Sequence, residues 1–412
     1  MNGVLIGKLQ NACYSASMHN RSIRRTLTLV PLTLVLLAPQ ALAQQSSWWP
    51  FGVNYAPSQA PSQAIVDYRY KLQQYQAARA AFEEQAGAYW SAVAEKRRVR
   101  NAKRGAGQPI ALDDYVLDQP PIYTGPKRPV NPEPLEEPEP QVRKSLPVVA
   151  DFVRAAQELY QFTPQQPATE AEFKRAYVRY ALASGLTRAQ AVRVYSFETG
   201  GNGNHDMQSG AHNGKPPIST AVGYNQLLTT NSVELLAEQG HELIRALSAK
   251  ASKLTGPARK AMDHKLAVLK RMVAQARAVP DTWSEHDKLG KTAQGWAMHA
   301  MVLDIDVGPM LQAHKLLTSV QFARAKGYAR PLTAAELEMM NLTGDGTGLD
   351  MVTMPQAMRE RVPTSNFFQR GGYERNPVAI RNNTVAKLLA VTDARMDSNS
   401  NNAGARELAS AN

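Results

Sequence analysis

The sequence predicts a mainly α-helical protein, and three patterns lead to this prediction. From Leu146 onward, apolar residues recur at three- and four-residue spacing in one segment after another. The alternating apolar and polar residues that are typical of β-strands are nearly absent. Further upstream, the segment from Ser62 to about Lys103 lacks proline and repeats apolar residues in heptads. With 412 residues, 43% of them hydrophobic and 20% charged, the chain can bury a large core.

The first 43 residues have the three regions of a secretory signal peptide. Arg21, Arg24 and Arg25 precede an apolar run over 27–37, and small residues follow up to Ala43. The apolar run is too short to span a bilayer, so we expect cleavage after Ala43 and export to the periplasm or the extracellular space, with Met18 as an alternative start. Residues 44–61 are polar and contain proline, which predicts a flexible lead-in.

The cysteine content bears on disulfide formation, and the net charge bears on the kind of partner that the protein binds. The only cysteine, Cys13, lies in the predicted signal peptide, so the exported chain cannot form disulfides. The whole chain has a net charge of +12, and loss of residues 1–43 removes four cations and no acid, which leaves +8. For an exported protein, this balance favours cell-wall polymers or a membrane surface over nucleic acid.

Two segments precede the main helical region. Residues 62–105 predict one long helix, and their heptad seam also suits a coiled coil; the helix ends in a basic cluster (Lys96, Arg97, Arg98, Arg100, Lys103 and Arg104). Nine prolines between Pro120 and Pro147, interleaved with glutamates, predict an extended linker over 106–147. We therefore expect this linker to separate the long helix from the rest of the chain.

Residues 148–395 predict a single helical domain, followed by a disordered tail over 396–412. Residues 232–290 read as a basic helical hairpin inserted into this domain. Loops rich in glycine and small polar residues are expected over 200–231 and 341–355, and loops of such length are often functional. The predicted helices are 148–160, 169–184, 188–199, 232–249, 257–277, 291–302, 306–325, 333–341 and 377–393.

Glu198 is the first candidate for a catalytic residue. Thr187 and Gln190 form a capping box that starts a helix, and Gly200 and Gly201 end it. Ala191, Val194, Tyr195 and Glu198 share one side of that helix, so the carboxyl group lies on the apolar stripe. Burial and the negative helix end both raise a carboxyl pKa, as a general acid requires. The alternative is a surface glutamate at a frayed helix end.

Four segments in order resemble the core signature of lytic transglycosylases and goose-type lysozymes. Glu198 ends its helix and a polar loop follows, after which Gly223-Tyr224-Asn225-Gln226 resembles the family's Gly-x-x-Gln turn. Residues 303–311 are similar to the helix that carries Asn-Ile-x-x-Gly-x-x-Tyr-Leu in the family. Residues 340–346 stand where the family has Tyr-Asn-Ala-Gly-x-Gly, with Met340 in place of the tyrosine.

The resemblance implies a lysozyme-like fold and a peptidoglycan-cleaving glycosidase. Glu198 would protonate the bond between N-acetylmuramic acid and N-acetylglucosamine, and then assist attack by the 6-hydroxyl of the sugar, which gives a 1,6-anhydro product. No cofactor is implied. The glycan strand would contact the two walls of a cleft, formed by Gly223, Tyr224, Asn225 and Gln226 on one side and by Asn341 and Gly344 on the other.

Other interpretations remain open at this point. A hydrolase would need a second carboxylate, for which Asp206 is the candidate, although an Asx turn is the simpler reading of that residue. The scattered histidines lack metal-ligand spacing, so no metal is expected. The main alternative is a non-catalytic peptidoglycan-binding or envelope scaffold protein, in which the long helix or the 232–290 hairpin contacts other envelope proteins. Nucleic acid binding is not expected.

Overall fold

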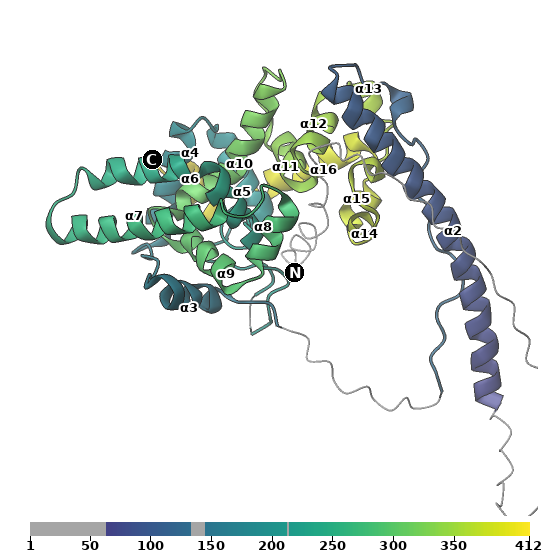
Figure 1. Ribbon diagram of the computed structural model, residues 1–412. Coiled ribbons are helices and arrows are strands. Elements are labelled where there is room, and N and C mark those ends of the chain that lie inside the picture. The colour runs from purple at the N-terminus through teal and green to yellow at the C-terminus, as the bar shows by residue number, and fades with distance from the viewer. Residues whose placement is uncertain (1–62, 133–144, 212–213) are drawn as a thin grey trace, which may run out of the picture. The chain divides into compact units, whose positions relative to one another are not determined.

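Helices make up most of the chain in the computed structural model, which describes residues 63–132, 145–211 and 214–412 (Figure 1). The described residues contain no β-strand and only isolated bridges, such as Gln208 with Val222 and Val222 with Leu227. The prediction of a mainly helical protein is confirmed. The predicted signal peptide (1–43) and lead-in (44–61) lie outside the described residues, as do residues 133–144 of the predicted linker.

Most helix positions agree with the predicted ones. An additional helix, α8, lies within the 232–290 hairpin, and the predicted 377–393 helix is divided into α15 and α16. None of the described helices is long and apolar enough to cross a membrane. The elements are α2 Gln63–Gly105, η1 Leu112–Asp114, α3 Val149–Tyr160, α4 Glu170–Ala183, α5 Arg188–Thr199, α6 Thr229–Ala251, α7 Gly256–Ala276, α8 Trp283–Gly290, α9 Ala293–His299, η2 Ala300–Leu303, α10 Gly308–Ala325, α11 Ala334–Thr343, α12 Asp345–Thr353, α13 Gln356–Arg359, η3 Thr364–Phe367, α14 Arg370–Glu374, α15 Pro377–Arg381, α16 Val385–Ser400 and α17 Ala403–Ser410.

The described chain divides into two units. The larger unit comprises Glu84–Ile122 together with everything described from 145 to 412, and the smaller unit comprises 63–83 and 123–132. In the smaller unit, the guanidinium of Arg79 lies 4.9 Å from the ring centre of Phe82 and 5.1 Å from that of Tyr123. These contacts hold the chain after Ile122 against the first half of α2.

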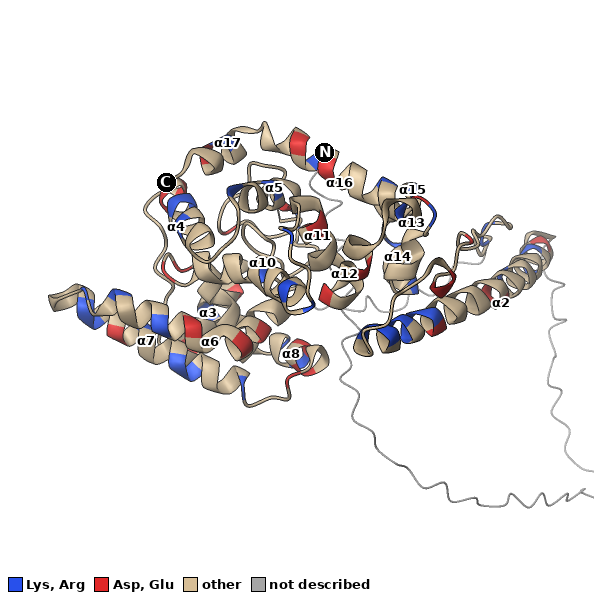
Figure 2. Cartoon of the chain, turned by 90° about the horizontal axis from the view of Figure 1, so that it is seen from above, with Lys and Arg blue, Asp and Glu red and all other residues tan. Residues whose placement is uncertain are grey.

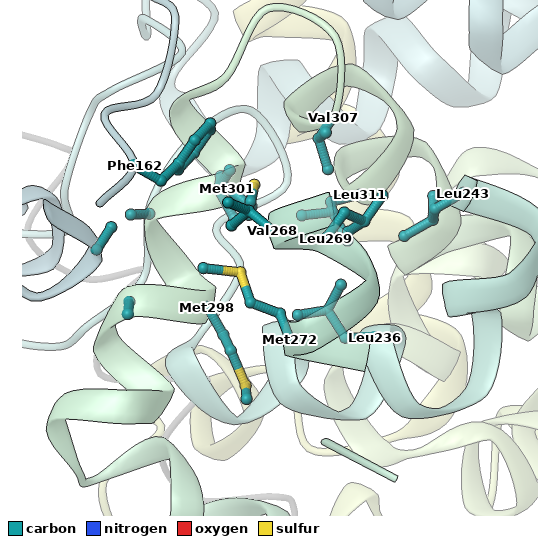
Figure 3. Packing of buried hydrophobic residues seen from close by; sticks show 14 of the residues in the cluster. Phe162, Leu236, Leu243, Val268, Leu269, Met272, Met298, Met301, Val307 and Leu311 are labelled. Atoms are coloured by element: carbon teal, nitrogen blue, oxygen red, sulfur yellow. The ribbon is translucent and has the colours of Figure 1, made fainter. Parts of the chain in front are cut away.

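The larger unit contains three clusters of buried apolar residues. The first lies between α3, α6, α7, α9 and the start of α10, and Figure 3 shows Leu236, Leu269, Met272, Met298 and Leu311 packed together there. The second surrounds α5 and includes residues of α4, α10, α11 and α17. The third joins the ends of α11 and α12 to the segment 362–388 and to Tyr115. The second cluster is the one that positions Glu198.

The second half of α2 packs on its own chain, which corrects the expected domain boundary near 105. Ala86, Val93 and Arg100 are buried at seven-residue spacing. The Arg97 guanidinium donates to the carbonyl of Asn366 at 3.0 Å, and Arg104 pairs with Asp350. The heptad seam of this half therefore faces the same polypeptide rather than a coiled-coil partner. Residues 106–122 of the predicted linker belong to the same unit, because η1 and Tyr115 pack beside α2.

Two further predictions are wrong. Residues 341–355 do not form a loop, because Asn341 lies inside α11 and α12 follows after Gly344. Gly348 allows this close packing, since a Cβ atom there would lie 2.4 Å from the Cα of Met340. Residues 396–412 are not a disordered tail but complete α16 and form α17, where Ala405 and Leu408 are buried and Glu407 pairs with Lys174.

The loop between α5 and α6 is confirmed, apart from Thr229–Asn231, which already belong to α6. His299 anchors this loop, because its Nε2 atom donates to the carbonyl of Thr220 at 2.9 Å, while Nδ1 lies 2.7 Å from the hydroxyl of Ser232. Burial lowers the pKa of His299 to about 4, against the opposing effect of its bond to Thr220. The imidazole is therefore neutral in the folded protein at neutral pH.

We expect His299 to make the fold sensitive to acid. In the unfolded chain the pKa of His299 is about 6.5, so this residue becomes protonated as the pH falls below that value. In the folded chain His299 stays neutral until the pH approaches about 4, so acid favours the unfolded state. Stability should fall by about 3 kcal/mol as the pH drops through this window. Thermal melts at pH 7 and 4.5 should show a smaller loss for His299→Gln than for the wild type. The exposed His264→Gln should behave as the wild type, and an equal loss in all three proteins would contradict the assignment.

Candidate functional site

Glu198 lies at the C-terminal end of α5, as predicted. Thr187 accepts a hydrogen bond from the backbone N–H of Gln190 at 3.1 Å, and the Gln190 side chain accepts one from the backbone of Thr187 at 2.8 Å. Gly200 and Gly201 have φ of 71° and 78°, left-handed values that favour glycine after a helix. The Glu198 residue is 3% exposed, so the prediction of a buried carboxyl group is confirmed.

The burial of α5 is more extensive than one apolar stripe implies. Its residues from 190 to 199 are buried except for Arg193, which pairs with Asp393 at 2.7 Å on α16. The helix packs against α16, α11, α17 and α4, so neighbours enclose it on several sides. Each polar side chain on it must therefore find a partner within the protein.

Asn341 joins Glu198 to a second carboxyl group that sequence reasoning missed. The Nδ2 atom of Asn341 lies 3.3 Å from Oε1 of Glu198 and 3.4 Å from Oε2 of Glu338. Both carboxyl groups therefore contact the same amide, one from α5 and the other from α11. Glu338 is 1% exposed. Its position three residues before Asn341 on a predicted helix is the signal that could have indicated it.

The pair cannot easily carry two negative charges. Burial, followed by the charge of Glu198, raises the pKa of Glu338 well above its usual value, and the bond from Asn341 and the charge of Lys315 oppose this only in part. Two neighbouring carboxyl groups in a water-poor site retain a proton that belongs to the pair as a whole. At neutral pH we therefore expect this site to hold one exchangeable proton.

Two cations face the pair from other helices. Lys315 on α10 is buried, and burial lowers its pKa, while the charges of Glu234, Glu198, Glu338 and Asp345 act in the opposite direction. Burial also lowers the pKa of Arg395 on α16, again against the charge of Glu198. The site thus combines amide, carboxyl and cationic groups from α5, α10, α11 and α16.

Further acids extend from Lys315 toward the surface at α6 and α12. Burial and the charge of Glu238 raise the pKa of the partly exposed Glu234 to about 7. Partial desolvation, together with the charges of Asp281 and Asp345, raises the pKa of Glu238 to about 6, although this residue lies at the surface. Burial raises the pKa of Asp345, whose carboxylate accepts a hydrogen bond from the Ser319 hydroxyl at 2.5 Å. The charge of Lys315 thus couples the buried pair of Glu198 and Glu338 to Glu234 and Asp345.

Comparison of the chain with protein-family models, with curated proteins and with solved structures found no match.

The predicted cleft wall over 223–226 is a tight turn locked into the core. A Cβ atom on Gly223 would lie 2.0 Å from Nε2 of Gln312, and Asn225 donates to the carbonyl of Gln312 at 2.7 Å. Gln226 has φ of 45°, and its amide donates to the carbonyls of Gly223 at 2.7 Å and Met207 at 3.2 Å. These hydrogen bonds hold the turn against α10, although Oδ1 of Asn225 is buried without a hydrogen-bond partner among the described residues.

Tyr224 is completely buried and closes a network that positions the loop after Glu198. Its ring centre lies 4.8 Å from that of Tyr195, and its hydroxyl donates to Glu170. Glu170 also pairs with Nδ1 of His205 at 2.7 Å. Although burial alone would raise the pKa of Glu170, these hydrogen bonds lower it and keep the carboxylate ionised. Tyr224 therefore supports α4, α5 and the loop together.

The remaining predicted residues divide between the site and its surroundings. Asp206 is exposed on the loop, and Gly344 is the partly exposed link between α11 and α12, with φ of 84°. A hollow lined by Thr187, Gln190 and Leu332 lies at the opposite end of α5 from Glu198. Within the described parts of the chain, no group of His, Cys, Asp and Glu side chains is placed to hold a metal ion.

Proposed function

We propose that the protein is an exported, peptidoglycan-cleaving glycosidase with a lysozyme-like helical domain, and most specifically a lytic transglycosylase with Glu198 as its acid and base. The observation that supports this most is the buried pair of Glu198 and Glu338 joined by the amide of Asn341. Such a pair keeps a proton available at neutral pH, which is what protonation of a glycosidic oxygen requires.

In this proposal, Glu198 donates the proton to the leaving oxygen, and the resulting carboxylate then accepts the proton of the sugar's 6-hydroxyl as that group attacks the anomeric carbon. Asn341 holds the carboxyl group in place, while Glu338 raises its proton affinity.

The same geometry favours a transglycosylase over a hydrolase. A hydrolytic pair of carboxyl groups flanks the sugar with roughly 5 to 9.5 Å between them. Here the amide of Asn341 contacts both Glu198 and Glu338, so it occupies the space that a sugar ring would need between them. Asp206, the other candidate, is exposed on the loop.

The second candidate function is a non-catalytic peptidoglycan-binding or scaffold protein. The burial of Tyr224 and Asn225 favours it, because these residues stand where the resembled family lines its sugar cleft. The low exposure of Glu198 also favours it, since a sugar can reach this carboxyl group only after neighbouring side chains move.

Incubation of purified sacculi with the protein (residues 44–412) separates the two candidates. The enzyme should release soluble muropeptides in an amount that grows with time. The scaffold should sediment with the sacculi and release nothing, which would overturn the proposed activity.

We expect Glu338→Gln to shift the pH dependence of sacculus cleavage. Burial and the charge of Glu198 raise the pKa of Glu338, so at high pH the pair resists losing its last proton. Removing one carboxyl group removes the mutual repulsion, and the alkaline limb of the rate profile should move to lower pH by about one unit or more. Glu360→Gln, at an exposed position on the same unit, should leave the profile unchanged. An unshifted limb in Glu338→Gln would contradict the coupling.

A further inference from the structure

The end of α6, the turn after it and α7, together residues 245–277, carry most of the excess positive charge of the chain, whereas the first part of α6 contains the acids Glu234, Glu238 and Glu242. Residues 245–277 include nine Lys and Arg and a single acid, Asp263, which amounts to +8 of the chain's +12. Figure 2 shows these cations as blue bands along both helices. The whole chain without residues 1–43 has the same net charge of +8, so the remainder of that chain is neutral overall.

About half of these cations are used inside the protein. Lys250 and Lys265 pair with Asp306, and Arg259 pairs with Asp263 at 2.9 Å. Arg271 lies 5.0 Å from the ring centre of Tyr160. These four side chains therefore stabilise the hairpin and its contacts with α3 and with the start of α10.

Five cations of the hairpin have no such role. Within the described residues, their side chains are exposed and make no ion pair or hydrogen bond: Arg245, Lys253, Lys260, Lys270 and Arg277. Lys253 and Lys260 lie near the tip, and Lys270 and Arg277 lie seven residues apart, on the same side of α7. From Lys260 to Arg277 the helix extends about 25 Å, a length that suits an extended polymer better than a small anion.

The composition of the hairpin narrows the class of polyanion. It contains no aromatic residue between 245 and 277, so it lacks the stacking surfaces that single-stranded nucleic acid binding uses. None of the exposed large hydrophobic residues of the described chain lies in this range, so nothing here would insert into a lipid bilayer. The exposed Lys and Arg side chains of residues 245–277 are spaced along a polar surface, so they complement a polar polymer that carries carboxylates at intervals along its length.

We propose that the exposed cations of the α6–α7 hairpin bind the free carboxylates on the peptide stems of peptidoglycan, as a holding site separate from Glu198. This inference rests on the proposed function, since it assigns the hairpin to the same polymer. Attachment through the stems would keep the protein on the glycan between successive cleavage events, by the gain in effective concentration that a second contact provides.

The test is sedimentation of the protein with purified sacculi, measured in the Glu198→Gln background so that the polymer stays intact. The hairpin variant replaces Lys253, Lys260, Lys270 and Arg277 by Gln. The control variant replaces four other exposed cations of the larger unit by Gln, which gives the same net charge: Arg361, Arg381, Lys387 and Arg406. All of these side chains are exposed, and equal melting temperatures would show that folding is intact.

We expect the hairpin variant to need about tenfold more protein for half-saturation at low salt, and the control variant to match its parent. The difference should vanish at about 0.5 M salt, where charges are screened within a few ångströms. Equal effects of the two variants, or no binding by the parent, would overturn the proposal. So would tighter binding to DNA or to vesicles with anionic lipids than to sacculi.

The sedimentation experiment and the muropeptide-release experiment can fail independently of each other. Binding that depends on the hairpin, together with no release of muropeptides by the wild-type protein, would refute the enzyme and leave the holding site standing. Release of muropeptides with normal binding by the hairpin variant would refute the holding site alone.

Discussion

Replacing Glu198 by Gln should lower the rate of muropeptide release from sacculi by about 10³-fold while the protein remains folded, since general acid catalysis contributes about 10² to 10⁴. Gln has nearly the same shape and can still meet Asn341, but it has no proton to donate at neutral pH. The removal of one of two adjacent buried carboxyl groups also relieves their repulsion, so we expect no loss of melting temperature.

The matched control is Asp206→Asn, which changes the other carboxyl group that the sequence indicated. Asp206 is exposed on the loop, so this variant should cleave sacculi at the wild-type rate. Comparable losses in both variants would argue against a single acid and base at Glu198. An unchanged rate in Glu198→Gln would exclude Glu198 from the reaction.

Replacing Arg100 by Ala should destabilise the larger unit by about 3 to 5 kcal/mol, the range for breaking a buried ion pair. Arg100 is fully buried, and its guanidinium donates to the carbonyls of Asp114 at 2.9 Å and Asn366 at 3.1 Å. The same group lies 4.4 Å from the ring centre of Tyr115 and 3.7 Å from the carboxylate of Asp350. Its loss leaves a cavity and buried acceptors without their donor.

Urea unfolding followed by circular dichroism measures this effect. Arg98→Ala is the control, because Arg98 lies on the same helix, is 73% exposed and pairs with the neighbouring Glu95. We expect its effect to stay below about 1 kcal/mol. A similarly small effect of Arg100→Ala would show that the second half of α2 is not anchored to the larger unit through this residue.

The predictions that succeeded rest on local signals. The limits of α5 follow from Thr187, Gln190 and the two glycines, all within one helix length of Glu198. The burial of Glu198 follows from its position relative to Val194 and Tyr195. Such features need no knowledge of which distant segments meet.

The features that the sequence did not reveal depend on distant contacts. Glu338 and Arg100 are charged residues on predicted helices, and the usual position of such residues is the surface. Their burial follows from the packing of α11 against α5 and of α2 against the segment around Asn366. Likewise, the polar residues 224 and 225 resemble a sugar-binding surface in the sequence, whereas in the fold they are buried and hydrogen-bond to Glu170 and Gln312.

The prediction of a loop over 341–355 was wrong because it rested on the glycine content of this region. Gly344, Gly346 and Gly348 suggested a flexible loop, whereas Gly348 allows α12 to approach Met340 closely. A residue without a side chain serves flexibility and close packing equally well, and only the partner helix distinguishes the two.

Analysis of the products formed from sacculi in ¹⁸O-labelled water tests the central claim most directly. The attacking hydroxyl belongs to the sugar in the proposed reaction, so the muropeptides should carry 1,6-anhydro ends without ¹⁸O, and Glu198→Gln should form none. Muropeptides with reducing ends that contain ¹⁸O, or an absence of products from the wild-type protein, would contradict the claim.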